Sequence, residues 1–345
     1  MRIALDAMGT DRHPAVEVEG ALQAMRELPG GFTILLVGDR DRIEAELARA
    51  GTAPSARLEV VHAPDCIIPG EPAAAAVRRK PDSSIVVGLK LQREGKADAF
   101  VSAGSTGAVM AASLFYLRPL PGVDRPAIGT ILPTAVQPLL LVDAGANVDC
   151  KPHHLLQFAR LGSIYVEDVW QRPRPRVGLL NIGEEPEKGD ELTVEAHRLL
   201  ADSGLHFIGN VEGRDVSRGS CDVLVADGCV GNVLLKFYES LAGFVHGLLR
   251  AELADEHISL DLDKLFRVFD YTEYGGAPLL GVNGHTIICH GGSPPRAIRN
   301  AIRVAIQAID ARMLGHIEGA LAGTGEDGSS AAGGWSRRTT EQEGV

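Results

Sequence analysis

Residues 139–147 read LLLVDAGAN, and this stretch decides the fold. It begins with an unbroken apolar run, Leu139 to Val142, which is typical of a strand whose two faces are both buried. A strand of this kind belongs in a parallel sheet that helices cover on both sides. The polar residues Asp143 and Asn147 follow at once and flank Gly145, which predicts a tight loop at the carboxyl end of the strand.

The same alternation of short apolar runs with helical patterns continues along the chain. Helices are expected at 105–117, 152–169 and 294–314, and no repeat of fixed period is present. The order is that of βαβ units, so the sequence predicts an α/β fold with a mostly parallel, doubly wound sheet. The expected strands are 2–6, 32–38, 58–62, 99–104, 139–145, 177–183, 207–213, 222–228 and 286–291.

Two regions depart from this rhythm. Residues 233–271 carry more helix than one crossover requires, with apolar residues such as Leu241 and Phe244 at helical spacing, and predict a protruding helical excursion. Residues 319–345 are rich in Gly, Ala and Ser and predict a disordered tail. We therefore expect one α/β domain over residues 1–318, including the excursion, followed by the tail.

The overall composition excludes several classes of protein. With 45% hydrophobic and 23% charged residues among 345, the chain has the make-up of a folded globular protein. The net charge of -11 argues against nucleic acid as a partner, because binding a phosphate backbone needs clustered Lys and Arg. The five cysteines are scattered without a CxxC pair, which indicates neither a disulfide framework nor a zinc site. Neither a signal peptide nor a membrane span is apparent, so we expect a cytoplasmic protein.

The segments that follow the apolar runs share one character, since each combines glycine with small polar side chains. In open α/β sheets ligands bind beyond the carboxyl ends of the strands. Glycine lets backbone N–H groups approach a ligand, and several of these segments lead into helices, whose N-termini favour anions. The alternative is that they are ordinary turn and cap residues. We favour a polar crevice for an anion at one shared edge of the sheet, with Ser102, Gly104, Ser105, Thr106, Asp143, Asn147, Asp227, His290 and Ser293 as its expected members.

A bound phosphate also needs a fixed positive charge, because one helix N-terminus contributes only about 0.3–1 kcal/mol to an anion. Lys188, in the segment EEPEKG at 184–189, is the leading candidate, although its neighbouring glutamates equally favour a solvated loop lysine. No GxxxxGKS/T motif is present, and none of the expected strands is followed by GxGxxG, so no nucleotide cofactor is expected. A GxSxG elbow is absent as well, which argues against a serine nucleophile. No metal is expected, because Cys289 and His290 occupy adjacent strand positions and should point to opposite faces.

In this order, the strand-end segments resemble the PlsX-type phosphate acyltransferase family. The resemblance runs from residue 1 to about 312. Its most specific pieces are DAMGTD (6–11), RKPDSS (79–84), SAGSTGA (102–108), VDAGANVDCKP (142–152), GLLNIGEEPEKG (178–189), GNVEGRD (209–215), DGCVGNVLLK (227–236) and YGGAPLLGV (274–282). The family usually has Gly at the position of Thr10, Asn at that of Ser105 and a bulky apolar residue at that of Cys229. The change at Ser105 matters most, because serine keeps a donor but loses the geometry of an amide in the expected anion loop.

The resemblance implies a fold shared with isocitrate dehydrogenase-like and phosphate acetyltransferase-like proteins, and a homodimer whose long helices pack together. It implies transfer of a fatty acyl group from acyl carrier protein to inorganic phosphate, giving an acyl phosphate for phosphatidic acid synthesis. A downstream membrane glycerol-phosphate acyltransferase then takes the product, and the helical tip makes peripheral contact with the cell membrane. The alternatives are a phosphate acetyl- or butyryltransferase that uses acyl-CoA, and a non-catalytic membrane-associated scaffold that binds acyl carrier protein.

Such chemistry needs no covalent intermediate, because phosphate is itself an anionic nucleophile that has only to be positioned. We expect Lys188 to bind the phosphate or the developing charge and Asn232 to donate to the thioester oxygen. Ser105, Thr106 and nearby backbone N–H groups should hold the phosphate.

The roles of two aspartates stay open between two alternatives. Asp143 and Asp227 end apolar strands and either orient Lys188 or cap helices, and we favour capping.

Two surfaces are expected to meet macromolecules or lipid. For the acidic carrier protein the candidates are Arg78, Arg79 and Lys80, or the row Arg296, Arg299 and Arg303 on one side of a helix, which is equally consistent with a solvated helix face. The apolar stripe from Leu241 to Phe269 is either a dimer core, which we favour, or a membrane contact near 258–266.

Overall fold

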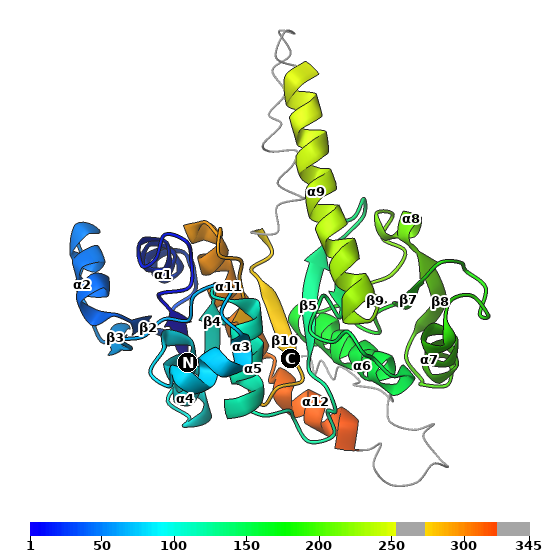
Figure 1. Cartoon of the computed structure of the whole chain (residues 1–345), viewed down its shortest axis with the longest axis horizontal. Helices are drawn as coiled ribbons and strands as arrows, with labels where there is room; N and C mark the ends of the chain where they lie inside the picture. Colours follow the sequence, from blue (N-terminus) through cyan, green and yellow to red (C-terminus); the bar gives the residue numbers. More distant parts are fainter. Residues whose placement is uncertain (253–272, 323–345) are drawn as a thin grey trace, which may run out of the picture.

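The computed structural model describes residues 1–252 and 273–322 and places an 11-stranded sheet between two layers of helices (Figure 1). The strand order is β3-β2-β1-β4-β11-β10-β5-β6-β9-β7-β8. The strands are β1 (Arg2–Asp6), β2 (Thr33–Gly38), β3 (Leu58–His62), β4 (Ala99–Ser102), β5 (Ala127–Leu132), β6 (Leu139–Val142), β7 (Val177–Asn181), β8 (Phe207–Glu212), β9 (Val223–Val225), β10 (Ala277–Leu280) and β11 (His285–Ile288). The helices are α1 (Ala15–Glu27), α2 (Arg40–Arg49), α3 (Ala73–Arg79), α4 (Ser84–Arg93), α5 (Thr106–Tyr116), α6 (Pro152–Val169), α7 (Glu191–Ala201), α8 (Gly213–Val216), α9 (Gly228–Glu252), α11 (Pro295–Asp310) and α12 (Met313–Ala322).

Strand direction reverses in the middle of the sheet. Strands β1 to β4 and β11 are mutually parallel, and so are β6 to β9. Between these two blocks, β10 and β5 pair antiparallel with each neighbour. The mostly parallel α/β sheet is confirmed, but the two blocks run in opposite directions. The expectation that all the polar strand ends share one edge is therefore wrong.

The two antiparallel strands are those that the sequence pattern does not predict. β10 contains Pro278, which has no N–H to donate and argues against a strand inside a sheet. β5 interrupts its apolar residues with Gly129 and Thr130, so it does not read as a buried strand. Both strands lie where the sheet changes direction.

β5 and β10 stay paired over only part of their length. Their register joins Leu280 to Ala127 and Leu279 to Ile128, whereas β5 continues to Leu132. Beyond Ile128, β5 pairs only with β6 among the described strands. The sheet therefore opens between β10 and the second half of β5, and this opening positions the site.

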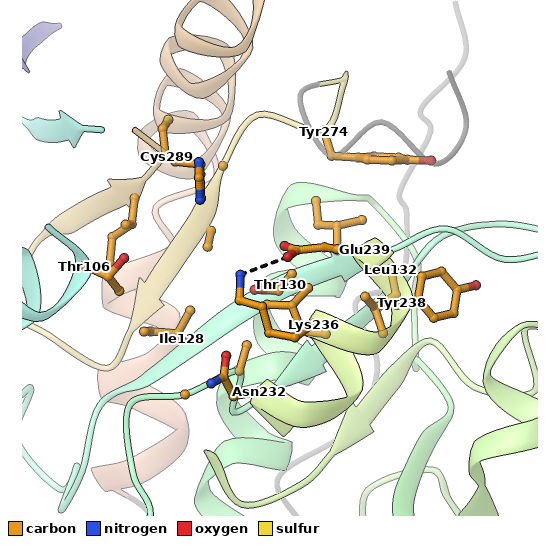
Figure 2. A pocket seen from close by; sticks show the side chains of 18 of the residues that line it. Thr106, Ile128, Thr130, Leu132, Asn232, Lys236, Tyr238, Glu239, Tyr274 and Cys289 are labelled. Atoms are coloured by element: carbon orange, nitrogen blue, oxygen red, sulfur yellow. Dashed lines mark hydrogen bonds and ion pairs between the residues drawn. The ribbon is translucent and has the colours of Figure 1, made fainter. Parts of the chain in front are cut away.

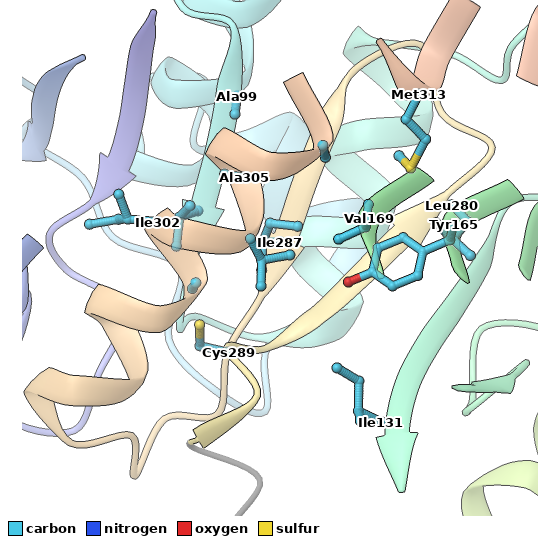
Figure 3. Packing of buried hydrophobic residues seen from close by; sticks show 14 of the residues in the cluster. Ala99, Ile131, Tyr165, Val169, Leu280, Ile287, Cys289, Ile302, Ala305 and Met313 are labelled. Atoms are coloured by element: carbon cyan, nitrogen blue, oxygen red, sulfur yellow. The ribbon is translucent and has the colours of Figure 1, made fainter. Parts of the chain in front are cut away.

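Two hydrophobic clusters cover the two faces of the sheet. Ile3 and Leu5 belong to one cluster and Ala4 to the other, because successive side chains of a strand point to opposite faces. The first cluster lies under α1, α2, α6, α7, α11 and α12, where Ile302 of α11 and Tyr165 of α6 are fully buried (Figure 3). The second lies under α3, α4, α5 and the base of α9.

Helix α9 extends well beyond the body of the molecule (Figure 1). It begins at Gly228, earlier than the expected excursion at 233, and its 25 residues span about 37 Å at 1.5 Å per residue. The rest of the expected excursion, residues 253–271, lies outside the described residues. Within the described ranges, no helix combines the length and the hydropathy that a membrane crossing needs.

The C-terminal helices differ from expectation. The helix expected at 294–314 is broken, because Arg312 takes a left-handed conformation with φ of 53° between α11 and α12. Residues 319–322 complete α12, so the disordered tail cannot begin at Gly319. Residues 323–345 of that expected tail lie outside the described residues. The predicted helices at 105–117 and 152–169 are confirmed as α5 and α6.

Candidate active site

A cavity of about 1020 Å³ occupies the opening between β5 and β10 (Figure 2). The N-terminus of α5 forms one side, α9 the opposite side, and the segment from β11 into α11 a third. Its lining mixes polar groups with an apolar wall, as in sites that hold a substrate with a charged end and a hydrocarbon end. The polar members include Thr106, Thr130, Asn232, Lys236, Glu239, Tyr274, His290, Ser293 and Arg296, and the apolar wall includes Met110, Ile128, Leu132, Leu235 and Ile288.

The N-terminus of α5 supplies backbone donors to the cavity. Ser105 is its N-cap, and its hydroxyl accepts a hydrogen bond from the Ala108 N–H at 3.4 Å. Thr106 and Gly107 are exposed and line the cavity. A helix start of this kind presents unpaired N–H groups and the positive end of the helix dipole to an anion. Ser105 therefore holds the helix end, while Thr106 faces the cavity.

Two other residues of the same loop support it from behind. Ser102 is fully buried, donates from its hydroxyl to Asp6 Oδ2 at 2.6 Å and accepts from the Gly104 N–H at 3.0 Å. Burial raises the pKa of Asp6, and the hydrogen bond from Ser102 opposes that shift. A Cβ on Gly9 would lie 2.7 Å from the Gly104 nitrogen, so the loops after β1 and β4 pack backbone to backbone. Ser102 and Gly104 do not line the cavity.

The first turn of α9 is fixed against the loop after β6, and this places Asn232. Asp227 caps the helix by accepting the N–H groups of Cys229 at 2.8 Å and Val230 at 3.1 Å. A Cβ on Gly231 would lie 1.9 Å from the Asp143 carbonyl oxygen, so only glycine allows this approach. Asn232 follows and lines the cavity beside Gly145.

Asp143 organises that loop rather than a helix. Its buried carboxylate accepts the N–H groups of Ile128 at 2.9 Å and Ala146 at 3.0 Å. Asn147 adds its N–H at 2.8 Å and its side-chain Nδ2 at 3.0 Å. Burial raises the pKa of Asp143, and these hydrogen bonds act against the rise. Capping by Asp227 is confirmed, whereas Asp143 and Asn147 hold the loop that α9 packs on.

The third wall is the turn between β11 and α11. His290 is exposed and its Nδ1 accepts the Gly292 N–H at 3.1 Å, while Ser293 is 2% exposed. Arg296 lies in the first turn of α11 and forms an ion pair with Glu273 at 2.9 Å. All three of His290, Ser293 and Arg296 line the cavity.

Lys188 lies elsewhere. It is exposed in the loop after β7, where its carbonyl accepts from Asn181 Nδ2 at 2.9 Å. It is not among the residues that line the cavity. The structure therefore brings together Thr106, Asn232, His290 and Ser293 but not Lys188, and its expected role stays a prediction.

The cavity contains a charged pair that the strand-end pattern does not predict. Lys236 Nζ lies 2.9 Å from Glu239 Oε2, and both residues line the cavity (Figure 2). A signal for them was available, since Lys236 and Glu239 follow Asn232 by one and by about two helical turns and so share its face.

The expected basic row on α11 is engaged with other groups. Arg299 lies 3.5 Å from Glu27, and Arg303 donates to the Glu273 carbonyl at 3.3 Å. Both are partly buried, and burial lowers the pKa of Arg303. Only Arg296 of this row reaches the cavity, so the three do not form an open basic stripe.

One cluster outside the cavity has ligand types that suit a metal. Asp124 Oδ2 lies 2.7 Å from His154 Nε2 and 3.1 Å from His153 Nε2. However, His154 Nδ1 accepts the Lys151 N–H at 2.9 Å, so the proton of the neutral ring is on Nε2 and donates to Asp124. A metal-bound histidine needs the opposite arrangement, with its other nitrogen donating. The cluster therefore fits a helix-end hydrogen-bond network better than a metal centre.

Comparison with known proteins gives one consistent result. A family model described as "Fatty acid synthesis protein" matches residues 1–315. The chain is 50% identical over 328 residues to a phosphate acyltransferase of Desulforamulus reducens, covering 93% of this chain and 97% of the relative. It is also 50% identical over 326 residues to a phosphate acyltransferase of Heliobacterium modesticaldum, covering 92% and 97%.

Solved structures show the same fold at low identity. A phosphotransacetylase from Streptococcus pyogenes superimposes with a TM-score of 0.63 at 17% identity, covering 90% of this chain and 94% of that one. The EutD phosphotransacetylase from Staphylococcus aureus gives a TM-score of 0.58 at 17% identity, with the same coverage. The expected phosphate acetyltransferase-like fold is confirmed.

Proposed function

The chain belongs to the phosphate acyltransferase family, and on that premise we propose that its acyl donor is the thioester of a fatty acyl group on acyl carrier protein. The enzyme is an acyltransferase, and the family description places it in fatty acid synthesis. The observation that carries the proposal is the cavity, in which the N-terminus of α5 and Asn232 face an apolar wall. A phosphate ion suits the polar part and a hydrocarbon chain suits the wall.

In the proposed reaction an oxygen of HPO4 2− attacks the thioester carbonyl carbon. The new C–O bond forms, the C–S bond breaks, and the proton of the phosphate ends on the released thiol, giving acyl phosphate. Thr106 and the backbone of the α5 N-terminus hold the phosphate, with Ser105 keeping that helix end in place. Asn232 donates from Nδ2 to the carbonyl oxygen as it gains negative charge. Positioning and charge stabilisation are the protein's share of the catalysis.

The deciding experiment is mass spectrometry for acyl phosphate after the protein is mixed with phosphate and either acyl carrier protein thioester or acyl-CoA. We expect product from the carrier thioester. Product from acyl-CoA alone would overturn the donor assignment. Binding of the carrier without release of its thiol would indicate a scaffold instead.

The residue roles are tested by substitution. Asn232→Ala should lower kcat about 100- to 1000-fold, as loss of one oxyanion donor does, and a loss below about tenfold would remove the role. Lys188→Ala should remove activity that raised phosphate does not restore. Because Lys188 is outside the cavity lining, full rescue by phosphate would reduce it to a remote binding residue.

We place the carrier-protein dock on α3 rather than on α11. Arg78 and Arg79 are exposed at the end of α3, and Lys80 follows in an ion pair with Glu71 at 2.6 Å. The start of α3 lies beside the cavity lining, because a Cβ on Gly107 would be 3.4 Å from Ala73 Cβ. Arg78→Glu with Arg79→Glu should raise KM for the acyl carrier thioester and leave that for phosphate unchanged. Equal changes in both would refute the dock.

We also propose a homodimer formed through α9. On the side of α9 away from the cavity, Val233, Phe237, Phe244 and Leu248 form an apolar face, with Phe237 60% and Phe244 62% exposed. A contiguous apolar face of this kind usually marks an interface. Phe237→Glu with Phe244→Glu should halve the mass measured by light scattering. A mass equal to that of the unsubstituted protein would refute the interface.

Two further partners complete the proposal. The acyl phosphate passes to a downstream membrane glycerol-phosphate acyltransferase. The peripheral membrane contact is assigned to 258–266, which lies outside the described residues. Liposome co-sedimentation of Leu262→Glu with Phe266→Glu tests it, and unchanged binding to lipid would exclude that segment.

A further inference from the structure

The structure assigns Lys236 as the cation that binds phosphate in the cavity, with Glu239 as the residue that positions it. This inference rests on the proposed function, because it concerns the phosphate substrate of that reaction. The roles proposed above do not change: Asn232 donates to the carbonyl oxygen, and the N-terminus of α5 contributes to phosphate binding.

One face of α9 meets the cavity. Asn232, Lys236, Glu239, Gly243 and His246 recur every three or four residues, so they lie along one side of the helix, and all five line the cavity. Figure 2 shows the Lys236–Glu239 pair near the middle of the opening, above Asn232. The apolar residues of α9 that are exposed lie on the other side of the helix. Lys236 is therefore directed to the site by the same periodicity that directs Asn232.

The positions of β5 and α9 set the level of Lys236 along the cavity. β5 and α9 run side by side in the same direction. At the start of β5, the Ala144 N–H donates to the Ile128 carbonyl near Asn232, and just beyond its end Tyr238 Oη of α9 donates to the Pro133 carbonyl at 2.5 Å. The start of β5 is thus level with Asn232, and its end is level with the second and third turns of α9.

The N-terminus of α5 lies toward the level of the second and third turns of α9. Ser102 at the end of β4 is in register with Ile288 of β11, which is opposite Ala277 of β10. Ala277 is two residues beyond Leu279, the partner of Ile128, on the side toward which β5 continues. The loop that leads to Thr106 therefore faces the part of α9 that carries Lys236, one turn above Asn232. Figure 2 shows the same order, with Thr106 across the opening from Lys236.

The reaction needs a particular spacing between the donor to the carbonyl oxygen and the cation that binds the phosphate. Residues four apart on a helix are separated by about 6 Å along its axis. Attack requires the phosphate oxygen within about 3–3.5 Å of the carbonyl carbon. A donor on the carbonyl oxygen and a cation on the other phosphate oxygens are then about one helical turn apart. Asn232 and Lys236 have that separation.

Hydrogen bonding on the ammonium group leaves capacity for a ligand. Lys236 has three N–H donors, and Glu239 accepts one of them. Among the described residues, no other partner of Lys236 is seen. By contrast, Arg296 across the cavity is paired with Glu273. Glu239 fixes the direction of Lys236 and keeps the site close to neutral before phosphate enters.

The test combines phosphate binding with steady-state kinetics on the full chain. Calorimetric titration with inorganic phosphate should show a Kd about 10- to 100-fold weaker for Lys236→Met, the ratio that loss of one charge-assisted hydrogen bond gives. KM for phosphate should rise with it, while KM for the acyl carrier thioester should change less than about twofold. Lys236→Arg should recover most of the phosphate affinity. Glu239→Gln should raise KM for phosphate, because Lys236 loses its fixed direction, whereas a general loss of folded enzyme lowers apparent kcat and leaves KM unchanged.

A matched control is available in the same chain. Lys96 and Glu94 form a pair at 2.8 Å with side chains 60% and 42% exposed, against 58% and 38% for Lys236 and Glu239, and they lie outside the cavity. Lys96→Met should change neither constant. If the unsubstituted enzyme makes acyl phosphate but Lys236→Met binds phosphate as tightly as it does, the inference fails and the proposed function stands. If the unsubstituted enzyme makes no acyl phosphate, the proposed function fails with it.

Discussion

Substitution of Gly231 by alanine tests how the site is built, because this glycine joins α9 to the loop after β6. The added Cβ would lie 1.9 Å from the Asp143 carbonyl oxygen and 3.1 Å from its carbon. Both are backbone atoms that cannot rotate away. To restore an ordinary contact of about 3.5 Å, helix and loop must separate by about 1.6 Å. Asn232 is the next residue of the helix, so it must move by a similar amount.

The expected result is a large loss of activity with a moderate loss of stability. Overpacking of this kind costs about 1–3 kcal/mol in the free energy of unfolding. Misplacement of a positioned group by about 1 Å can cost about 100-fold in rate. Urea unfolding and kcat for acyl phosphate formation measure the two effects. Gly247→Ala is the matched control, since nothing lies within 4 Å of its Cβ and it should stabilise α9 by up to about 1 kcal/mol. If Gly231→Ala keeps more than about a third of kcat, the contact does not position Asn232.

Three further outcomes follow from buried groups. Burial raises the pKa of Glu17 to about 7, so the folded protein holds this proton more tightly than the unfolded chain and loses stability as pH rises from about 4.5 to 7. Glu17→Gln should remove about 3 kcal/mol of that loss, measured by urea unfolding at pH 8 and at pH 4.5. If stability falls with pH equally in the variant and in the unsubstituted protein, the prediction is refuted. Asp143→Asn places an NH2 group against the N–H groups of Ala146 and Asn147 and should cost about 3 kcal/mol, whereas an unchanged urea midpoint would show that the loop does not depend on the carboxylate. Ser102→Ala leaves the buried Asp6 without the hydroxyl that donates to it at 2.6 Å, and should cost about 1–3 kcal/mol of stability, seen as a fall of a few degrees in the thermal midpoint. A larger fall in kcat is expected only if the α5 loop shifts. An unchanged thermal midpoint would contradict the hydrogen bond.

Local patterns predicted the elements that have ordinary local signals. The run at 139–142 is β6, and the helix at 152–169 begins with Pro152 at its first turn. The pattern could not reveal β10, because Pro278 opposes a strand locally and the surrounding sheet overrides that preference. Nor could it reveal strand direction, which depends on pairings such as that of Leu279 with Ile128, far apart in sequence.

The site was predictable to the same extent. Asn232 and Thr106 were found because each follows a strand end and begins a helix, which is a local signal. Lys236 has no such signal, because it lies one helical turn beyond the residues that follow the strand end. Lys188 was chosen because it follows a strand end, yet β7 is two strands away from β6, in the sequence β6-β9-β7, and its loop does not line the cavity. Topology, rather than residue type, separated these two lysines.

The reversal of strand direction explains why a helix, and not another strand end, completes the cavity. In a uniformly parallel sheet, β4 and β9 would end at the same edge, and the helices after them would both lead away from it. Here β9 runs opposite to β4, so α9 starts at the level of Ile128 and climbs beside β5 toward the N-terminus of α5. Successive turns of one helix then present Asn232, Lys236 and Glu239 along the cavity at fixed spacing. The substrate's carbonyl and phosphate are therefore matched to the pitch of α9, and a one-residue insertion between Asn232 and Lys236 would turn Lys236 about 100° away from the cavity.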